Sequence, residues 1–174
     1  MKKKSFLKIY LGAPLFSEQE QFWNIHVENK IKDKFGDKVR IYNPCNNDEI
    51  NDKSGYADSL AIYHADNEHL DKSDVMIALL DGVALDAGLS SEIGRFAHIA
   101  ENSKDKYILG VYSDVRQGNV SEEKVVALND LAESQWSYLN LYTVGAIKNN
   151  GMIYSGIDEM IEDLEKLMGE LLND

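Results

Sequence analysis

The residues after one apolar run have types and a spacing that could support chemistry. The run, Val75–Leu80, predicts a buried strand. The loop after it and the first turns of the next predicted helix carry three acids and two glycines: Asp81, Gly82, Asp86, Gly88 and Glu92. In an open α/β sheet, ligands bind beyond the carboxyl ends of the strands. The loop has no Lys, no Arg and no G-x-G-x-x-G spacing, so it is a poor phosphate cradle. Its carboxylates favour acid–base or nucleophilic chemistry on a neutral, hydroxyl-rich substrate.

Glu92, Asp86 and Asp66 are the three acids that we expect to converge on this strand end. Each of them also has an ordinary structural explanation. Glu92 falls beside the apolar stripe of its helix, but a glutamate in a first turn also suits the helix dipole. Asp86 in the loop is alternatively an Asx-turn or helix-capping residue. Asp66 lies about 70° from the centre of the apolar face of the preceding helix, and is alternatively part of a solvated face. Taken together, the three acids predict a carboxylate site.

The composition excludes several classes of partner. The chain has 174 residues and a formal net charge of −12. This charge argues against a nucleic-acid polymer or an anionic membrane as partner, because phosphate binding needs clustered Lys and Arg. No apolar stretch approaches the roughly 20 residues of a membrane span. The single cysteine, Cys45, fits a reducing cytoplasm, and the four histidines lack metal-ligand spacing, so no metal is expected.

Strand-like and helix-like patterns alternate along the chain. Strands are predicted over residues 6–12, 39–42, 75–80, 107–112 and 139–147. Helices are predicted over residues 17–35, 56–70, 89–100, 121–132 and 157–172. In the second of these helices, four residues are expected on the inward face: Tyr56, Leu60, Tyr63 and Leu70. The alternation predicts a single α/β domain over residues 1–174, with five parallel strands and helices on both faces. The second strand is expected outside the first, which gives the flavodoxin-like, Rossmann-like order 2-1-3-4-5.

Several short motifs resemble, in order and spacing, those of the nucleoside 2-deoxyribosyltransferases. The stretch Lys8–Phe16 is similar to the opening strand and loop of that family. Residues 81–94 are similar to its D-G…D-x-G-x-x-x-E-(I/L)-G signature, and Asp66 lies 20 residues before the second aspartate of that signature. Residues 43–48 resemble its P-x-(D/N)-N segment, and Leu139–Leu141 resembles its (I/L)-N-L motif. The similarity covers most of the chain.

The resemblance implies transfer of a 2-deoxyribosyl group between nucleobases with retention, without a metal or an organic cofactor. Glu92 would be the nucleophile that forms a deoxyribosyl ester. Asp66 would give a proton to the leaving base or contact the base, and Asp86 would hold the sugar or the base; these two roles stay open. Tyr10 would hydrogen-bond the Glu92 carboxylate and orient it, although packing at the strand end explains a tyrosine there equally well. The partners implied are 2′-deoxynucleosides and free nucleobases.

Other positions of the family pattern imply contacts with the substrate or between subunits. Phe16 would stack near the base, and is alternatively an apolar staple beside the helix cap. Gly12 in the opening loop, Gly88 in the signature and Asp48 in the base-contacting segment are expected at the substrate. Asn140 would contribute its side chain to the active site of a neighbouring subunit. This role implies a cytoplasmic homo-oligomer, a hexamer or a dimer, with shared active sites.

Two departures from the family pattern leave the base preference open. Asp48 stands where some members have a Gln that contacts the base, and a final helix follows where those members end on an aromatic residue. Ser90 and Ser91 raise an alternative: an N-glycosidase that hydrolyses 2′-deoxynucleosides or their 5′-monophosphates. Against it, the first loop lacks the glycine-and-arginine cluster of such hydrolases. The third hypothesis is a non-catalytic nucleoside- or nucleotide-binding module, but the presence of all three acids favours an enzyme.

Overall fold

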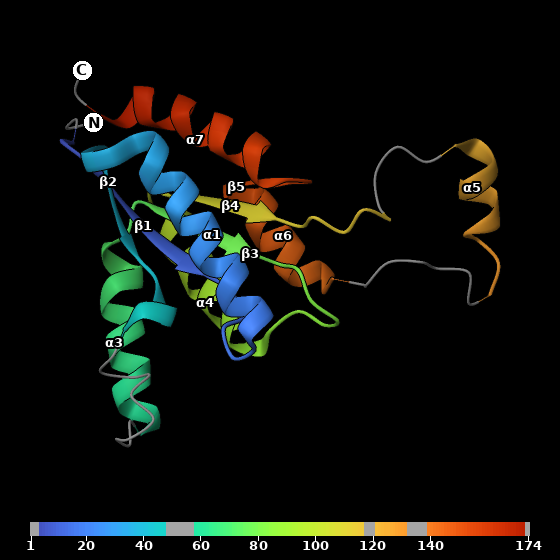
Figure 1. Cartoon of the computed structure of the whole chain (residues 1–174), viewed down its shortest axis with the longest axis horizontal. Coiled ribbons are helices and arrows are strands. Elements are labelled where there is room, and N and C mark those ends of the chain that lie inside the picture. Colours follow the sequence, from blue (N-terminus) through green and yellow to red (C-terminus); the bar gives the residue numbers. More distant parts are fainter. Residues whose placement is uncertain (1–3, 48–57, 117–120, 132–138, 173–174) are drawn as a thin grey trace.

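Five parallel strands form one sheet in the computed structural model, which describes residues 4–47, 58–116, 121–131 and 139–172 (Figure 1). The strands are β1 (Leu7–Gly12), β2 (Val39–Tyr42), β3 (Val75–Leu79), β4 (Tyr107–Val111) and β5 (Gly151–Tyr154). Their order is β2-β1-β3-β4-β5, and every neighbouring pair is parallel. The predicted fold class and strand order are therefore confirmed.

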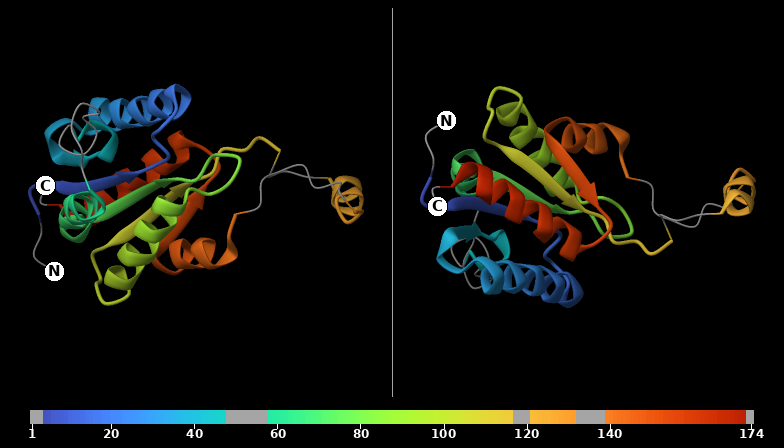
Figure 2. Two further views of the ribbon diagram at one scale, coloured as in Figure 1. Left: turned by 90° about the horizontal axis from the view of Figure 1, so that it is seen from below. Right: turned by 90° about the horizontal axis from the view of Figure 1, so that it is seen from above.

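Helices cover both faces of this sheet, as Figure 2 shows from two opposite sides. One face carries α1 (Glu18–Phe35) and α7 (Ile157–Leu171), and the other carries α3 (Ser59–Lys72), α4 (Ala87–Ala100) and α6 (Leu141–Asn150). The short helix α5 (Glu122–Ala127) lies apart from the sheet (Figure 1). The two helix layers account for the two hydrophobic clusters of the core.

Alternation along the strands assigns each side chain to one of these layers. In β1, the odd-numbered residues from Leu7 to Leu11 belong to the cluster with α1 and α7, whereas Tyr10 belongs to the cluster with α4. All five residues of β3 are buried, as expected for a strand that is covered on both faces. Tyr10 and Gly12 therefore face the helix that carries Glu92.

The start of α1 is fixed by a capping box, which the S-x-x-E pattern predicts. The Ser17 hydroxyl accepts the Glu20 backbone N–H at 3.2 Å, and Glu20 Oε2 accepts the Ser17 N–H at 2.8 Å. The helix ends at Gly36, whose φ of 52° favours glycine. The capping box holds the loop after β1 at the carboxyl edge of the sheet.

The predicted strand over residues 139–147 is wrong. This stretch leads into α6, and the fifth strand is Gly151–Tyr154. Its β-branched and aromatic residues suggested a strand, but the buried pair Thr143 and Ile147 are four apart, on one helical face. Asn140 begins the helix, because its side-chain oxygen accepts two backbone N–H groups of the first turn.

The predicted inward face of the helix before β3 is also partly wrong. Residues 56–57 lie outside the described residues. Leu70 is the buried residue of α3, whereas Leu60 and Tyr63 are 65% and 55% exposed. Figure 1 shows α3 reaching past the edge of the sheet, so its first turns have no strand to pack against.

Candidate active site

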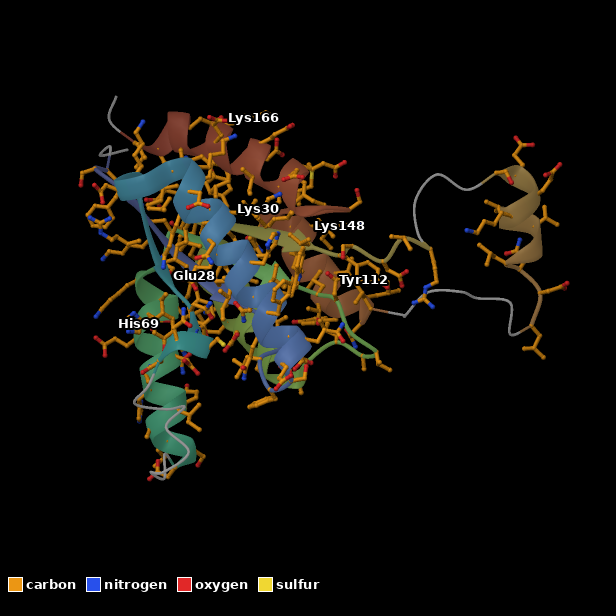
Figure 3. All side chains as sticks on the ribbon, in the orientation of Figure 1. Glu28, Lys30, His69, Tyr112, Lys148 and Lys166 are labelled. Carbon is orange, nitrogen blue, oxygen red and sulfur yellow. The ribbon has the colours of Figure 1, made fainter. Side chains whose placement is uncertain are left out.

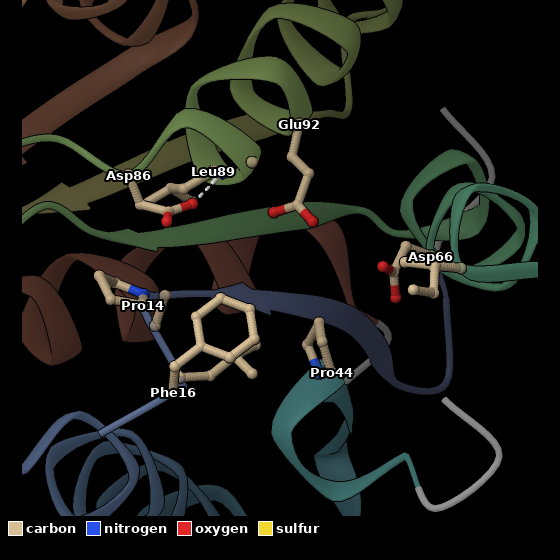
Figure 4. A pocket seen from close by; sticks show the side chains of 11 residues that line it. Pro14, Phe16, Pro44, Asp66, Asp86, Leu89 and Glu92 are labelled. Atoms are coloured by element: carbon tan, nitrogen blue, oxygen red, sulfur yellow. Dashed lines mark hydrogen bonds between the residues drawn. The ribbon is translucent and has the colours of Figure 1, made fainter. Parts of the chain in front are cut away.

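A cavity of about 400 Å³ opens at the carboxyl edge of the sheet (Figure 4). It lies between the loop after β1, the turn after β2 and the helices α3 and α4. Its lining is Ala13, Pro14, Leu15, Phe16, Pro44, Ile62, Asp66, Asp86, Gly88, Leu89 and Glu92. The lining therefore brings together five predicted site residues from three separate parts of the chain. A mainly apolar cavity with a few convergent polar groups is typical of a small-molecule site.

Glu92 projects from the second turn of α4 into this cavity (Figure 4). Its Oε1 accepts a hydrogen bond from the Tyr10 hydroxyl at 2.7 Å. Burial raises the pKa of Glu92 to about 7; the Tyr10 hydrogen bond opposes this rise, and the charges of Asp66 and Asp86 add to it. A carboxyl group that titrates near neutral pH is available both as an acid and as a nucleophilic carboxylate.

The end of β1 supplies two residues that hold this glutamate. Tyr10 is fully buried, and burial together with the nearby charge of Glu92 raises the pKa of its hydroxyl, which therefore stays a donor. At Gly12, a Cβ atom would lie 2.7 Å from Leu89 Cδ1 and 3.3 Å from Glu92 Oε2. Glycine is needed there for the close approach of α4. Tyr10 thus holds Oε1, while Oε2 lies beside the backbone of Gly12.

Asp66 reaches the same cavity from α3 (Figure 4). Its Oδ1 accepts a hydrogen bond from the Tyr42 hydroxyl at 2.9 Å. Burial raises the pKa of Asp66 above the usual value of an aspartate, while the Tyr42 hydrogen bond and the charge of His69 oppose the rise. Asp66 therefore holds a proton more readily than an exposed aspartate, which suits a proton donor.

Asp86 is the N-cap of α4, as its structural alternative predicts. Its Oδ1 accepts the Leu89 backbone N–H at 2.8 Å, and a Cβ atom on Gly88 would lie 3.1 Å from that same oxygen. The side chain also lines the cavity, and its charge raises the pKa of Glu92. One carboxylate therefore caps the helix and borders the cavity, so the two explanations are compatible.

Phe16 lies at the rim of the cavity (Figure 4). Its backbone N–H donates to Glu20 Oε2 at 3.0 Å, so the capping box of α1 also fixes this residue. The side chain is 79% exposed, which does not match the packed ring of an apolar staple. An exposed ring at a cavity rim is free to stack on a flat ligand.

Comparison with known proteins places this geometry in a family. A family model for nucleoside 2-deoxyribosyltransferases matches residues 9–131, which is more than half of the chain. The chain belongs to this family. A conserved protein from Enterococcus faecalis V583, known from a crystal structure, is 40% identical, with a TM-score of 0.82 over 92% of this chain and 98% of that one.

Two solved 2-deoxyribosyltransferases share the fold. The Bacillus psychrosaccharolyticus structure gives a TM-score of 0.58 at 17% identity, over 92% of this chain and 95% of that one. The Leishmania mexicana structure gives 0.59 at 16% identity, over 92% and 97%. A comparison with curated protein sequences gives no match.

Of the residues that the resemblance singled out, one is outside the part of the chain that the structure describes, and another does not line the cavity. Asp48 lies outside the described residues. Asn140 is the N-cap of α6, where its Oδ1 accepts the N–H groups of Tyr142 at 3.0 Å and Thr143 at 3.3 Å. It does not line the cavity around Glu92.

Metal-binding clusters and membrane spans are both absent from the described part of the chain. Within those residues, no three His, Cys, Asp or Glu side chains are grouped to hold a metal ion. No helix among them combines the length and the apolar character needed to cross a membrane.

Several residues at the cavity were not singled out as site residues from the sequence, among them Pro44, Ile62 and Tyr42. Pro44 and Ile62 line the cavity, and Tyr42 hydrogen-bonds Asp66. Tyr42 carries a usable signal, because it ends a strand beside the strand of Tyr10. Using that signal requires the register in which these two tyrosines are paired. Ile62 has no comparable signal, since it belongs to a helix turn that lies past the sheet.

Proposed function

We propose that the protein exchanges the nucleobase of a 2′-deoxynucleoside, with a 2-deoxyribosyl ester on Glu92 as the intermediate. The observation that carries the proposal is the environment of Glu92: a partly buried carboxyl group with a pKa of about 7 in a cavity of nucleoside-binding size. Tyr10 occupies Oε1. Oε2 is therefore the oxygen that attacks the sugar.

Each half-reaction is a displacement at the anomeric carbon C1′. In the first, ionised Glu92 Oε2 attacks C1′, the bond from C1′ to the base nitrogen breaks, and Asp66 gives its proton to the leaving base. In the second, a nitrogen of the incoming base attacks C1′, the ester bond breaks, and the proton of that nitrogen passes to Asp66. Two inversions give net retention, and neither step uses a metal or an organic cofactor.

The reactive protonation state follows from the two neighbouring carboxyl groups. The charge of Asp66 raises the pKa of Glu92, so the two groups resist being ionised together. A proton on Asp66 removes its charge and so favours the ionised form of Glu92. This one protonation state supplies both the nucleophile and the proton donor.

The remaining cavity residues are assigned to substrate binding. Asp86 borders the cavity beside Glu92, so we assign it to a sugar hydroxyl, and Phe16 at the rim to the face of the base. A carboxylate packed against C1′ leaves little room for a 2′-hydroxyl, which also destabilises an oxocarbenium-like transition state. We therefore expect 2′-deoxynucleosides to react much faster than ribonucleosides.

We also propose that the site is completed by Asn140 of a second copy, in a homo-oligomer. The Oδ1 atom of Asn140 caps its own helix, and among the described residues its side-chain nitrogen has no acceptor. The next two residues, Leu141 and Tyr142, are 83% and 85% exposed. Adjacent exposed apolar side chains favour a protein contact at this end of α6.

An exchange assay tests the proposed activity directly. The protein is mixed with deoxyinosine or thymidine and with adenine, and the products are separated by chromatography. Deoxyadenosine is the expected product. Release of the free base without deoxyadenosine would contradict transfer and indicate an N-glycosidase. A reaction with inosine as fast as with deoxyinosine would contradict the assigned sugar preference.

The covalent step has its own measurement. Mass spectrometry of the protein with a donor and no acceptor should show a 2-deoxyribosyl adduct on the peptide that contains Glu92. An adduct on any other residue would overturn the assignment of the nucleophile.

The 5′-monophosphate alternative has weaker structural support. The Ser90 hydroxyl donates to the Asp86 carbonyl at 2.8 Å, and the Ser91 hydroxyl donates to the Ala87 carbonyl at 3.0 Å. Both hydroxyls therefore give their protons to the backbone of α4, and neither points a donor at a phosphate.

A further inference from the structure

Two tyrosines on neighbouring strands each hold one of the cavity carboxylates. Tyr10 of β1 and Tyr42 of β2 are register partners, so their side chains leave the same face of the sheet. Their ring centroids are 5.5 Å apart. Tyr10 donates to Glu92 of α4 at 2.7 Å, and Tyr42 donates to Asp66 of α3 at 2.9 Å. The Tyr42–Asp66 pair on β2 therefore has the same tyrosine-to-carboxylate arrangement as the Tyr10–Glu92 pair on the neighbouring strand β1.

The hydroxyl of Tyr42 has a fixed direction. The Asn47 side-chain nitrogen donates to the Tyr42 oxygen at 2.9 Å. A phenol has only one proton, so with its oxygen accepting from Asn47, that proton points to Asp66 Oδ1. A protonated Asp66 must then carry its own proton on Oδ2, because Oδ1 is already accepting one.

The ring of Tyr42 is held as firmly as its hydroxyl. The His69 imidazole stacks on it with the ring centroids 3.8 Å apart and the planes within 5°. The turn that carries Asn47 is tied to α1 through buried Glu28, which Figure 3 labels on that helix; its Oε2 accepts from Asn43 at 2.7 Å and Asn46 at 2.8 Å. These contacts fix the approach of Tyr42 to Asp66 from both sides.

We propose that Tyr42, aligned by Asn47, is a positioning residue that keeps the transferable proton of Asp66 on Oδ2. This inference rests on the proposed function, in which Asp66 exchanges that proton with the leaving and incoming bases. Tyr42 itself does not touch the reacting atoms. It acts on the reaction through Asp66, as Tyr10 acts through Glu92.

The charged and titratable groups around Asp66 determine how its pKa should change when the Tyr42 hydroxyl is removed. Burial raises the pKa of Asp66, and the Tyr42 hydrogen bond and His69 lower it. Tyr10 and Glu92 face it from β1 and α4 and interact with its charge. Removing the Tyr42 hydroxyl takes away a donor to the ionised form, so the pKa of Asp66 must rise.

The test compares Tyr42→Phe with a matched control, Tyr154→Phe. Tyr154 of β5 also donates to an aspartate, Asp163 of α7, whose Oδ2 lies 2.8 Å from the hydroxyl. Neither Tyr154 nor Asp163 lines the cavity. In carboxyl-13C-labelled protein, the Asp66 resonance is assigned with Asp66→Asn and titrated by NMR. In Tyr42→Phe this resonance should titrate at higher pH than in the wild type, and in Tyr154→Phe at the wild-type pH.

Kinetics give a second readout that simple destabilisation would not produce. Tyr42→Phe should lower kcat about tenfold, the effect of one lost hydrogen bond to a charged group, with little change in KM. Its pH–rate profile should move toward higher pH. Asn47→Ala should shift the Asp66 titration in the same direction by less, since the phenol keeps its proton but loses its alignment.

The outcomes separate this inference from the proposed function. The titration needs no substrate, so an unchanged Asp66 titration in folded Tyr42→Phe overturns the role of Tyr42 even if the wild type transfers deoxyribose. In the opposite case, the wild type transfers no deoxyribose but the Asp66 carboxyl titrates at higher pH in Tyr42→Phe than in the wild type. That result overturns the proposed function and supports the positioning of Asp66 by Tyr42.

Discussion

The carboxyl group of Glu92 lies in surroundings that oppose its charge. Burial keeps water away from it, and Asp66 and Asp86 add negative charge, against one hydrogen bond from Tyr10. The same environment makes the group reactive and destabilises the folded chain whenever the group is ionised. Activity and stability should therefore respond in opposite directions to the removal of this charge.

Glu92→Gln should abolish transfer and stabilise the fold at alkaline pH. The pKa of Glu92 is about 7 in the folded chain and 4.5 in the reference state. Between these values the folded chain binds more protons than the unfolded one, so the stability of the wild type falls as the pH rises through this window. Glutamine does not titrate and can still accept from Tyr10. At about 1.4 kcal/mol per pH unit, the variant should gain up to about 3 kcal/mol at pH 8 relative to pH 4.

Urea unfolding of both proteins at pH 4 and pH 8 measures this difference. Glu101→Gln, an exposed position just after the same helix, is the control and should change neither stability nor transfer. A stability difference that is equal at the two pH values would contradict the buried, titrating carboxyl group. Residual transfer above about a thousandth of the wild-type rate would contradict the nucleophile.

Gly12→Ala should damage the site through contact alone. The new methyl group would meet Leu89 at 2.7 Å and Glu92 Oε2 at 3.3 Å, so α4 must move or the glutamate must turn. We expect a loss of about 1–3 kcal/mol in unfolding free energy and a lower kcat. Gly94→Ala in α4 meets nothing within 4 Å and should gain up to about 1 kcal/mol. Wild-type kcat in Gly12→Ala would contradict the close approach.

Residue types and spacing predicted that three acids meet at one site, and all three line the cavity. Asp66, Asp86 and Glu92 are each ambiguous alone, but their places on successive elements required them to meet at one sheet edge. Tyr42 was not predicted, because its role depends on the register of β1 and β2, which no local pattern encodes. Asp48 stays a prediction, since it lies outside the described residues.

At the scale of elements, the start of α4 combines a helix cap with a binding surface. Asp86→Asn should keep the cap and change stability by less than about 0.5 kcal/mol, whereas Asp86→Ala should lose about 1 kcal/mol. Both variants remove the carboxylate that we assign to the sugar, so both should lose transfer activity to a similar degree. Thermal unfolding and exchange assays of the pair separate the two roles. Full activity in Asp86→Asn would show that the residue is only a cap.

Strand and helix patterns predicted the central elements well and the last strand badly. β3 is buried on both faces, and its unbroken apolar run identifies it; the run of β1 is interrupted only by the exposed Lys8. Residues 139–147 are rich in β-branched and aromatic types, yet they lead into a half-exposed helix whose packing against α4 decides its conformation. The true strand β5 has four residues, with Met152 exposed at the sheet edge, so its hydrophobic signal is weak.

At the scale of the whole molecule, the strand order creates the site. β1 lies between β2 and β3, so the carboxyl end of β1 meets the turn after β2 and the helix after β3 at one edge. The alternation of patterns predicted this order, and with it the meeting of α3 and α4 at the cavity. Asn140 and α6 do not line that cavity, so the role proposed for this residue requires a second copy of the chain.

A mixed oligomer should reveal whether Asn140 works across a subunit boundary. Asn140→Asp keeps the N-cap, because an aspartate oxygen accepts the same N–H groups, but removes the amide donor. If a neighbour supplies this donor, Asn140→Asp and Glu92→Ala should each be inactive alone. After subunit exchange, some pockets combine an intact Glu92 with the intact Asn140 of another chain, so activity should return. Glu92→Ala mixed with Asp66→Ala is the control and should stay inactive, because both residues of one cavity come from the same chain. Failure to recover activity in the first mixture after verified exchange, or full activity in a monomer by light scattering, would show that Asn140 serves only its own chain.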